Sequence, residues 1–445
     1  MPAKLKITQT AYAERRSVIA EKMPPMSMAI LPGARKKIRN GDAEYLFRQS
    51  SDFYYLTGFS EPNAFLVLRK DKKGVVQFIL FCEIVTPAEE KWTGKKVTLL
   101  EAVNEWGADI AYENAELDLK MPELLAGCRE IYYTLGRCSK WDKKIIGWAK
   151  KASDIPGKRG DKEHISWQDF YPLVASERVI KSPAEIKLIQ KACEISANAH
   201  VALMKHCLPN QREYELEALF LQQCYQAGCR SMAYSSIVGG GSNACVLHYV
   251  DNQDSLKSGD LVLVDAGGEF ENYAADITRT FPVNGQFTDD QKSIYNLVLK
   301  AQQEAIEIVK PGIRFEDLQK TIVQVLVEGL VSLGILKGDA ETLIKEKAYF
   351  PFYMHNSGHW LGLDVHDAGD YYMSGESCLL KEGMVLTVEP GLYFSLTEQS
   401  IDAKWRGIGV RIEDDILVTR TGCEVLTLYA PKTVEAIEAT MQRVL

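Results

Sequence analysis

The stretch that most constrains the fold lies at residues 261–281, where two apolar, strand-like runs flank a Gly-Gly pair and each run carries one aspartate. Strand-like runs on either side of a glycine turn signal predict a β-hairpin. We expect the turn to be centred between Phe270 and Glu271. That register places Asp265 directly opposite Asp276, with their Cβ atoms roughly 4.5–5.5 Å apart. One aspartate alone could simply cap a turn, but two buried carboxylates in facing register repel each other and predict a neutralising cation.

Length and composition bound the class of protein. The 445 residues are enough for two domains with a large buried core. A net charge of -8 and the lack of a Lys/Arg block argue against a nucleic-acid surface. The first residues lack the apolar core of a signal peptide and no apolar run approaches about 18 residues, so we expect a cytoplasmic protein without a membrane segment. The ten cysteines include no Cys-x-x-Cys pair, which favours buried free thiols over a zinc ribbon or a disulfide scaffold.

The first part of the chain, residues 1–172, mixes helical and strand signals and predicts a compact α/β domain. Its clearest strands are expected at residues 64–68 and 75–81, which are largely apolar. The polar, glycine-containing stretch 154–161 suggests a domain boundary. We therefore expect a second domain over residues 173–445.

Two aromatic features of the first domain have ordinary structural explanations. Residues 44–62 are too aromatic and too rich in turn residues for a plain helix, so we interpret them as core packing around a tight turn. Trp92 precedes a Thr-Gly pair. On the residues alone, we favour a packed aromatic over a ligand contact at this position.

The start of the second domain is marked by a helix signal. Ser182 is followed by proline at the first helical position and by Glu185 at the third, which predicts a capping box and a helix running past His200. Further helices are expected at residues 213–227, 289–309 and 314–333. The glycine run 239–241 lacks the Gly-Lys-Ser/Thr ending of a phosphate loop, so we expect a turn there. His248 follows in strand-like surroundings.

Three later clusters each set polar residues inside apolar, glycine-bounded sequence. The first, at residues 355–367, holds three of the seven histidines. In the second, Glu389 ends a strand immediately before a Pro-Gly turn. In the third, Arg411 and Glu413 share one face of a strand, because side chains alternate along a strand with a period of two. A surface salt bridge would explain any single carboxylate, but not their recurrence in buried-looking strands.

Four carboxylates and one imidazole together form an oxygen-rich ligand set, comprising Asp265, Asp276, His359, Glu389 and Glu413. Such a set suits Mn²⁺, or else Co²⁺ or Zn²⁺. Two divalent ions would balance four carboxylates. Ions about 3.5–4 Å apart would lower the pKa of a bridging water from about 15.7 toward roughly 7. The residues alone therefore predict a hydrolase with a two-metal centre.

Five segments resemble the signature segments of the M24 "pita-bread" metallopeptidases, most closely those of the Xaa-Pro aminopeptidases (aminopeptidase P). They lie at residues 264–267, 275–282, 358–367, 389–393 and 407–415. Residues 47–59 resemble the N-terminal domain of the same group, so the resemblance covers nearly the whole chain. It implies an α/β N-terminal domain followed by an α+β pita-bread (creatinase/aminopeptidase-like) catalytic domain.

The resemblance also implies a role for each metal ligand. Asp265 would bind one ion, and Asp276 and Glu413 would bridge both. His359 and Glu389 would complete the two coordination shells, and Glu389 would also shuttle a proton during catalysis. This sequence does not depart from the family pattern at the five ligand positions.

Further residues match family positions that contact or support the substrate, namely His248, His355, His366, Arg411, Tyr393 and Trp92. The resemblance implies catalytic roles for His248 and His366, with His366 polarising the scissile carbonyl. His355, Arg411 and Tyr393 would bind or support the substrate. Trp92 would correspond to an aromatic that reaches toward an active site across subunits.

The reaction implied by the resemblance is hydrolysis of the bond between an N-terminal residue and a following proline in peptides. Peptide substrates, no nucleic acid or membrane partner, and a homodimer or homotetramer are expected. One alternative is an Xaa-Pro dipeptidase (prolidase), which shares the metal set. A pseudo-peptidase that only binds peptides, and a metal-free creatine-hydrolysing branch, are both disfavoured by the intact ligands.

Overall fold

The computed structural model describes residues 5–154 and 165–442. The chain divides into two compact units, an N-terminal unit, Ile7–Glu177, and a C-terminal unit that takes the chain from Arg178 onward. This division lies five residues beyond the boundary expected after residue 172. Apart from Asp154, the polar stretch that suggested a boundary lies outside the described residues.

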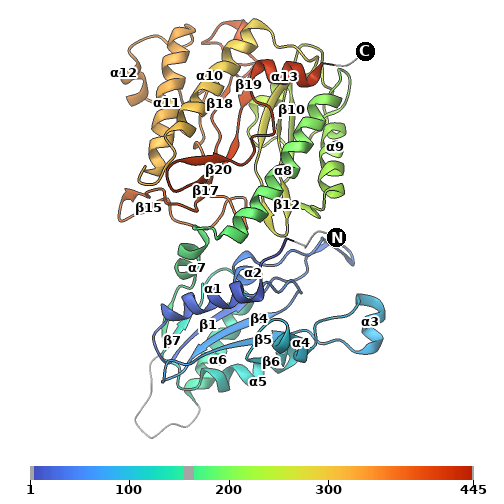
Figure 1. Ribbon diagram of the computed structural model, residues 1–445, viewed down its shortest axis with the longest axis vertical. Coiled ribbons are helices and arrows are strands. Elements are labelled where there is room, and N and C mark those ends of the chain that lie inside the picture. Colours follow the sequence, from blue (N-terminus) through green and yellow to red (C-terminus); the bar gives the residue numbers. More distant parts are fainter. Residues whose placement is uncertain (1–4, 155–164, 443–445) are drawn as a thin grey trace. The chain divides into compact units, whose positions relative to one another are not determined.

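The N-terminal unit is built on a six-stranded mixed sheet with the order β6-β5-β4-β1-β7-β8 (Figure 1). Its strands are β1 (Ser27–Pro32), β4 (Phe65–Lys70), β5 (Val76–Cys82), β6 (Ile110–Glu113), β7 (Glu130–Tyr132) and β8 (Ser166–Gln168). The pairs β1–β4 and β4–β5 are antiparallel, whereas β5–β6, β1–β7 and β7–β8 are parallel. The two strands expected from the sequence are confirmed as β4 and β5.

Helices cover both faces of this sheet. Helices α5 (Leu117–Leu125) and α6 (Ser139–Ser153) pack on the face that carries Phe65 and Val67. Leu66 and Leu68 point to the opposite face and are also fully buried. Helix α1 (Gln9–Glu21) packs there, with the Arg16 guanidinium 4.0 Å from the ring centre of Phe78. The remaining elements of this unit are β2 (Ile38–Asn40), β3 (Ala43–Glu44), α3 (Pro87–Thr93), α4 (Leu99–Asn104) and α7 (Tyr171–Arg178), whose last residue opens the C-terminal unit.

The structure confirms the prediction for one of the two aromatic features of the N-terminal unit and contradicts the other. The segment at 44–62 contains helix α2 (Ser51–Thr57), all of whose residues are buried. It ends at Gly58, where a φ of 64° makes a tight left-handed turn, so the interpretation as core packing around a turn is confirmed. The packing interpretation of Trp92 is wrong, because its side chain is 90% exposed on α3.

The C-terminal unit contains the long helices expected from the sequence. They are α8 (Pro183–His206), α9 (Glu213–Gln226), α10 (Asp289–Glu307) and α11 (Phe315–Ser332), joined by the shorter α12 (Ala340–Lys345) and α13 (Val434–Met441). The capping box is confirmed, since the Ser182 hydroxyl accepts from Glu185 N–H and the Glu185 carboxylate accepts from Ser182 N–H. Across residues 5–154 and 165–442, no helix is both long and apolar enough to cross a membrane. All ten cysteines are free thiols and most are buried.

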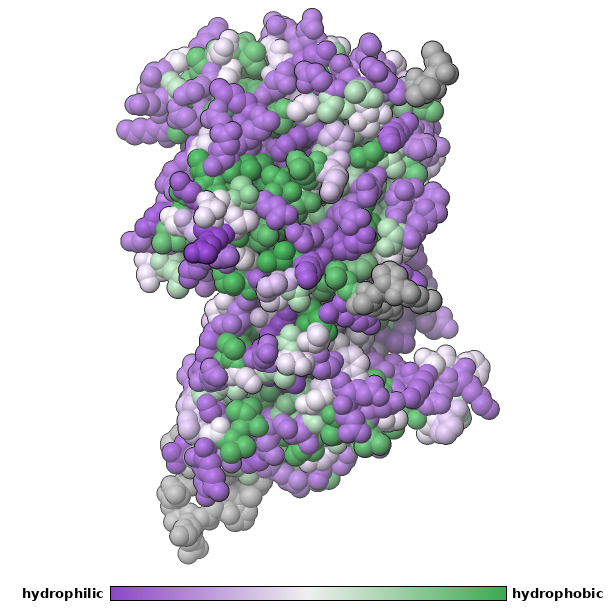
Figure 2. Space-filling view, viewed as in Figure 1, coloured by the Kyte–Doolittle hydropathy of each residue, from purple (hydrophilic) through white to green (hydrophobic). Residues whose placement is uncertain are grey.

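Short antiparallel sheets lie between these helices, with α8 and α9 along one side and α10 and α11 along the other (Figure 1). The strands are β9 (Ser231–Met232), β10 (Ile237–Gly240), β11 (Leu261–Asp265), β12 (Gly268–Phe270), β13 (Tyr273–Ala274), β14 (Thr278–Pro282), β15 (Tyr372–Met373), β16 (Glu376–Ser377), β17 (Val385–Val388), β18 (Gly391–Tyr393), β19 (Gly409–Arg411), β20 (Asp414–Val418) and β21 (Cys423–Val425). Figure 2 shows hydrophobic side chains gathered over the middle of this unit, where Figure 1 places β17 and β20.

The central hairpin forms, but in a different register from the expected one. Its turn is centred on Glu271 and Asn272, whose φ angles of 48° and 68° are those of a two-residue hairpin turn. Asp265 therefore pairs with Thr278 and not with Asp276. The glycine pair misled the sequence prediction, because Gly267 does not turn the chain. A Cβ at Gly267 would lie 1.8 Å from the Ala275 carbonyl oxygen, so this glycine allows two backbones to approach closely.

Two local predictions near residue 240 are also wrong. Gly239 and Gly240 belong to β10, where they pair with Leu263 and Val262, and are not a turn. A Cβ at Gly239 would lie 2.8 Å from backbone atoms that follow in the chain, so glycine is required by close packing. His248 lies in a turn and not in a strand.

Candidate metal centre

A cavity of about 1060 Å³ in the C-terminal unit collects most of the predicted site residues. Its lining includes Asp265, Asp276, His359, Glu389, Glu413, His248, His355, His366 and Arg411. Tyr393 lies behind this lining, where its buried hydroxyl contacts Arg411 and His355. Trp92 belongs to the N-terminal unit.

Strand ends bring the four carboxylates together. Asp265 is the last residue of β11, Asp276 precedes β14, Glu389 follows β17, and Glu413 precedes β20. His359 comes from a loop that is tied to β17, because Thr387 donates its N–H to the His359 carbonyl at 2.9 Å. The Thr387 hydroxyl in turn accepts from His359 N–H at 3.0 Å. The five predicted ligands therefore lie on or beside hydrogen-bonded strands.

Three of the predicted ligands are close enough to share one ion. One ligand atom from each of Asp276, His359 and Glu413 lies within 4.8 Å of the others. His359 Nε2 is 3.3 Å from Asp276 Oδ2 and 3.8 Å from Glu389 Oε1. Carboxylates and an imidazole at these separations match the donor types that divalent transition ions prefer.

The site carries more buried negative charge than its own cations neutralise. Burial and the neighbouring carboxylates raise the pKa values of Asp276 and Glu413, and burial raises the pKa of Glu389 to about 7. Burial alone would lower the pKa of His359, but its hydrogen bond with Asp276 raises it to about 9. Arg411 neutralises part of the charge by donating to Asp265 Oδ2 at 2.7 Å. The residues therefore fit a site for added cations.

Arg411 also begins a hydrogen-bonded chain along the cavity wall. Its Nη1 donates to the Tyr393 hydroxyl at 3.0 Å, and that hydroxyl lies 2.8 Å from His355 Nε2. His355 Nδ1 is 2.8 Å from the carbonyl oxygen of Asn356, which can only accept. The Nδ1 atom is therefore the donor, and Nε2 accepts from Tyr393. Burial and the nearby guanidinium lower the pKa of His355 to about 4, which keeps this imidazole neutral.

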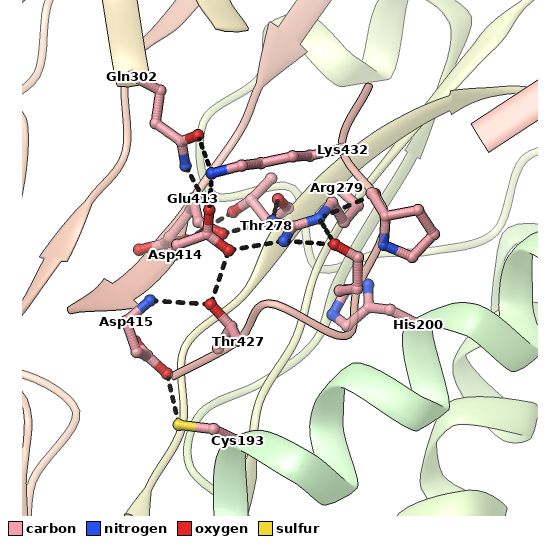
Figure 3. A network of polar contacts seen from close by, with 12 residues as sticks. Cys193, His200, Thr278, Arg279, Gln302, Glu413, Asp414, Asp415, Thr427 and Lys432 are labelled. Atoms are coloured by element: carbon pink, nitrogen blue, oxygen red, sulfur yellow. Dashed lines mark hydrogen bonds and ion pairs between the residues drawn. The ribbon is translucent and has the colours of Figure 1, made fainter. Parts of the chain in front are cut away.

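A buried network behind the site holds the strands that carry the ligands (Figure 3). Arg279 donates to the Glu413 carbonyl at 2.5 Å and to Asp414 Oδ1 at 2.6 Å. Lys432 Nζ lies 2.6 Å from the other Asp414 oxygen. Asp415 accepts from Asp276 N–H at 3.0 Å. Asp276 and Glu413, the two carboxylates that the resemblance implies would bridge the ions, are thus anchored through their backbones to one network.

The sequence interpretation missed two groups that touch the carboxylates. The Tyr234 hydroxyl hydrogen-bonds to Asp265 Oδ1 at 2.6 Å and also contacts Asp276 Oδ1. The Thr278 hydroxyl donates to Glu413 Oε2 at 2.7 Å. Thr278 lies in a segment that the family resemblance had already marked. Nothing in the sequence distinguished Tyr234 from the other tyrosines.

Comparisons with known proteins agree with this arrangement. The sequence pattern of metallopeptidase family M24 matches residues 187–420, and that of the aminopeptidase P N-terminal domain matches residues 12–132. The Xaa-Pro aminopeptidase of Haemophilus influenzae is 42% identical over 436 residues, which are 98% of this chain and 98% of that protein. This relative therefore matches the chain over both of its units.

Two solved structures are similar over nearly the full length. Aminopeptidase PepP of Pseudomonas aeruginosa superposes with a TM-score of 0.95 at 43% identity, covering 98% of each chain. The zinc-substituted aminopeptidase P of Escherichia coli in complex with product gives a TM-score of 0.94 at 40% identity, again covering 98% of each chain. The agreement extends over both units, and this chain belongs to metallopeptidase family M24, with an N-terminal domain of the aminopeptidase P type.

Proposed function

We propose that the protein is a dinuclear metal-dependent aminopeptidase that hydrolyses the bond between an N-terminal residue and a following proline. The observation that carries this proposal is the convergence of three buried carboxylates, the partly exposed Glu389 and His359 on one cavity. Preference for proline rests on the names of relatives that match over nearly the whole chain.

Five residues would hold the two divalent ions, namely Asp265, Asp276, His359, Glu389 and Glu413. Mn²⁺ is our first choice, with Co²⁺ or Zn²⁺ as alternatives, because oxygen donors dominate the set. The similar Escherichia coli protein has been obtained in a zinc-substituted form. When bound, two such ions would supply Lewis acidity and lower the pKa of a water molecule.

The chain's own residues provide the proton transfers. Glu389 lines the cavity with Oε1 3.8 Å from His359 Nε2, so its carboxylate is placed to accept a proton from water and return it to the leaving nitrogen. His366 lines the same cavity, where partial burial lowers its pKa, and its imidazole can donate an N–H to the carbonyl oxygen. His248 lines the same cavity and is assigned the third catalytic position. His355, Arg411 and Tyr393 would orient the peptide through the chain they form.

A comparison of short peptides tests the function. Ala-Pro-Ala should release alanine, whereas Ala-Ala-Ala should be nearly untouched, and a tripeptide should be preferred to Ala-Pro. The bond before proline has no amide N–H, so a site adapted to it needs no acceptor there. Liquid chromatography of the products decides the matter. Comparable release of alanine from Ala-Ala-Ala would contradict the proline preference, and cleavage confined to Ala-Pro would indicate a dipeptidase.

We further propose that the protein is cytoplasmic and assembles as a homodimer or homotetramer. In such an assembly the exposed Trp92 would reach the active site of a neighbouring subunit. Size-exclusion chromatography with light scattering measures the assembly. Trp92→Ala should then raise KM for Ala-Pro-Ala without changing bound metal, and an unchanged KM would contradict a substrate contact.

A further inference from the structure

A buried cluster of charges lies beside the loop that carries His366. Asp367 Oδ1 is 2.5 Å from Arg178 Nη2, and Asp367 Oδ2 is 3.0 Å from Lys181 Nζ. The side chains of all three residues are at most 3% exposed. Burial alone would raise the pKa of Asp367, but Lys181 and Arg178 hold it below its ordinary value, so the residue is a carboxylate. Arg178 also reaches Asp364 Oδ2 at 2.8 Å.

Stability alone is a weak explanation for such a cluster. Removing several charges from water is costly, and buried ion pairs often stabilise a fold no better than well-packed apolar residues would. Their best-attested use is to select one local conformation over others. The segment whose conformation this cluster would select is the loop at residues 360–367.

The loop is wound around the Asp367 carboxylate. Asp367 Oδ1 accepts from Asp364 N–H at 3.2 Å, and Asp367 N–H donates to the Trp360 carbonyl at 2.9 Å. Gly362 passes so close that a Cβ there would lie 2.3 Å from Asp367 Oδ2. The Asp367 backbone therefore joins the two ends of the loop, and the Asp367 carboxylate fixes the turn at Asp364 between them.

His366 depends on this loop for its position. Within residues 5–154 and 165–442, its exposed ring makes no hydrogen bond, and its ring contact is with His359, at 4.4 Å between centroids. A side chain without its own hydrogen bonds is placed by its backbone. The adjacent backbone is the one that Asp367 fixes.

We propose that Asp367, held between Lys181 and Arg178, is a positioning residue that orients His366 toward the scissile carbonyl. This inference rests on the proposed function, because the cluster positions the residue, His366, to which that function gives a role in the transition state. Asp367 itself is buried and is not among the residues that line the cavity. Its effect must therefore pass through His366, which makes the inference testable by combining two substitutions.

The test is a double-substitution cycle with Ala-Pro-Ala as substrate. His366→Ala should lower kcat by about 10²–10³, the typical value of one oxyanion donor. Asp367→Asn should lower kcat by up to about 10² through misplacement of that donor, with KM and bound metal nearly unchanged. In the His366→Ala background, Asp367→Asn should cause no further loss, because the group it positions is already absent. An equal loss in both backgrounds, or loss of bound metal, would overturn the proposal.

Two further variants keep the test sound. If Asp367→Asn does not fold, Lys181→Met takes its place in the test. This variant leaves Arg178 beside the carboxylate and should also lower kcat. Lys181→Arg restores the positive charge and should recover most of the activity. A matched control is Asp52→Asn, since Asp52 is another buried aspartate that is paired with an arginine. It should leave kcat unchanged in either background. Wild-type cleavage of Ala-Pro-Ala is measured first, because its absence would contradict the proposed function and not the role of Asp367.

Discussion

At the scale of single residues, Arg411 illustrates why a buried guanidinium cannot be exchanged for an ammonium group. Its three nitrogens reach three different partners, with Nε 3.1 Å from the Thr278 hydroxyl, Nη1 bound to Tyr393 and Nη2 bound to Asp265. A lysine has one nitrogen and cannot span this set. We therefore predict that Arg411→Lys lowers metal affinity or activity about 10- to 100-fold, the usual effect of losing an outer-shell partner.

The measurement for Arg411→Lys is bound metal by atomic emission together with kcat and KM. The matched control is Arg406→Lys, because Arg406 donates to the Ile401 carbonyl and does not line the cavity. Wild-type metal content and turnover in Arg411→Lys would contradict the supporting role assigned to the guanidinium.

The bridging carboxylates provide a second test at this scale. Asp276→Ala or Glu413→Ala should abolish activity and lower bound metal while the fold survives, because each residue is assigned to both ions. Circular dichroism monitors the fold and atomic emission the metal. Near-wild-type turnover and metal content in either variant would exclude a two-metal centre that uses these residues.

The sequence was sufficient to identify the carboxylates of the site, but not the side chains that form hydrogen bonds and ion pairs with such buried carboxylates. Asp276, Glu389 and Glu413 were recognisable because a carboxylate inside an apolar strand requires compensation. The Tyr234 hydroxyl that contacts Asp276 is 42 residues away in the chain, and no local pattern records such a contact. The same holds for Arg178, which meets Asp367 from 189 residues away. Long-range polar contacts follow from the fold and not from spacing.

At the scale of elements, the signals that succeeded were local ones. The capping box at Ser182 and the helices after it depend on neighbouring residues, and the structure confirms them. The hairpin register failed because two turn signals competed within six residues. The Gly-Gly pair at 267–268 supports a turn centred between Phe270 and Glu271, whereas Glu271 and Asn272 adopt the positive φ angles. Asparagine is one of the residues that tolerate this conformation, and it was the more informative signal.

Gly267→Ala tests the function assigned to this glycine within the hairpin. A Cβ there would meet the Ala275 carbonyl oxygen at 1.8 Å and force apart the segments that carry Asp265 and Asp276. We predict a destabilised C-terminal unit and loss of bound metal. The matched control is Gly422→Ala, where a Cβ has no neighbour within 4 Å, and its melting temperature and metal content should match the wild type. Equal behaviour of the two variants would contradict the packing requirement.

At the scale of the whole molecule, we predict that bound cations stabilise the C-terminal unit. The C-terminal unit places carboxylates from four separate strand ends in one buried cluster, which is unfavourable without positive charge. Ions that bind only the folded state stabilise it by mass action. The N-terminal unit lacks this cluster, because all five assigned ligands belong to the C-terminal unit. Metal removal should therefore lower the melting temperature of the C-terminal unit alone.

The pH dependence of that effect is the sharpest prediction. In the metal-free protein the pKa of Glu389 is raised by burial to about 7, and the pKa of His359, despite burial, is raised by Asp276 to about 9. Because both pKa values are higher in the folded state than in the unfolded state, both groups stay protonated to a higher pH when the unit is folded. The stability that they contribute is present at low pH and is lost as the pH rises to these folded-state pKa values. His200 and His355 act in the opposite direction, since burial lowers their pKa values to about 4, but both are neutral above about pH 6.5.

Between about pH 6.5 and 9, the metal-free C-terminal unit should thus lose stability while the metal-loaded unit does not, because bound cations take the place of the protons. Differential scanning calorimetry at constant free metal should show the gap between the two melting temperatures widening with pH. The N-terminal unit serves as an internal control, with a melting transition that metal does not shift. Glu389→Gln should remove the widening below about pH 7, where Glu389 titrates, and leave the widening between about pH 7 and 9, which belongs to His359. A gap that is constant or narrows with pH would mean that protons and metal do not compete for these carboxylates.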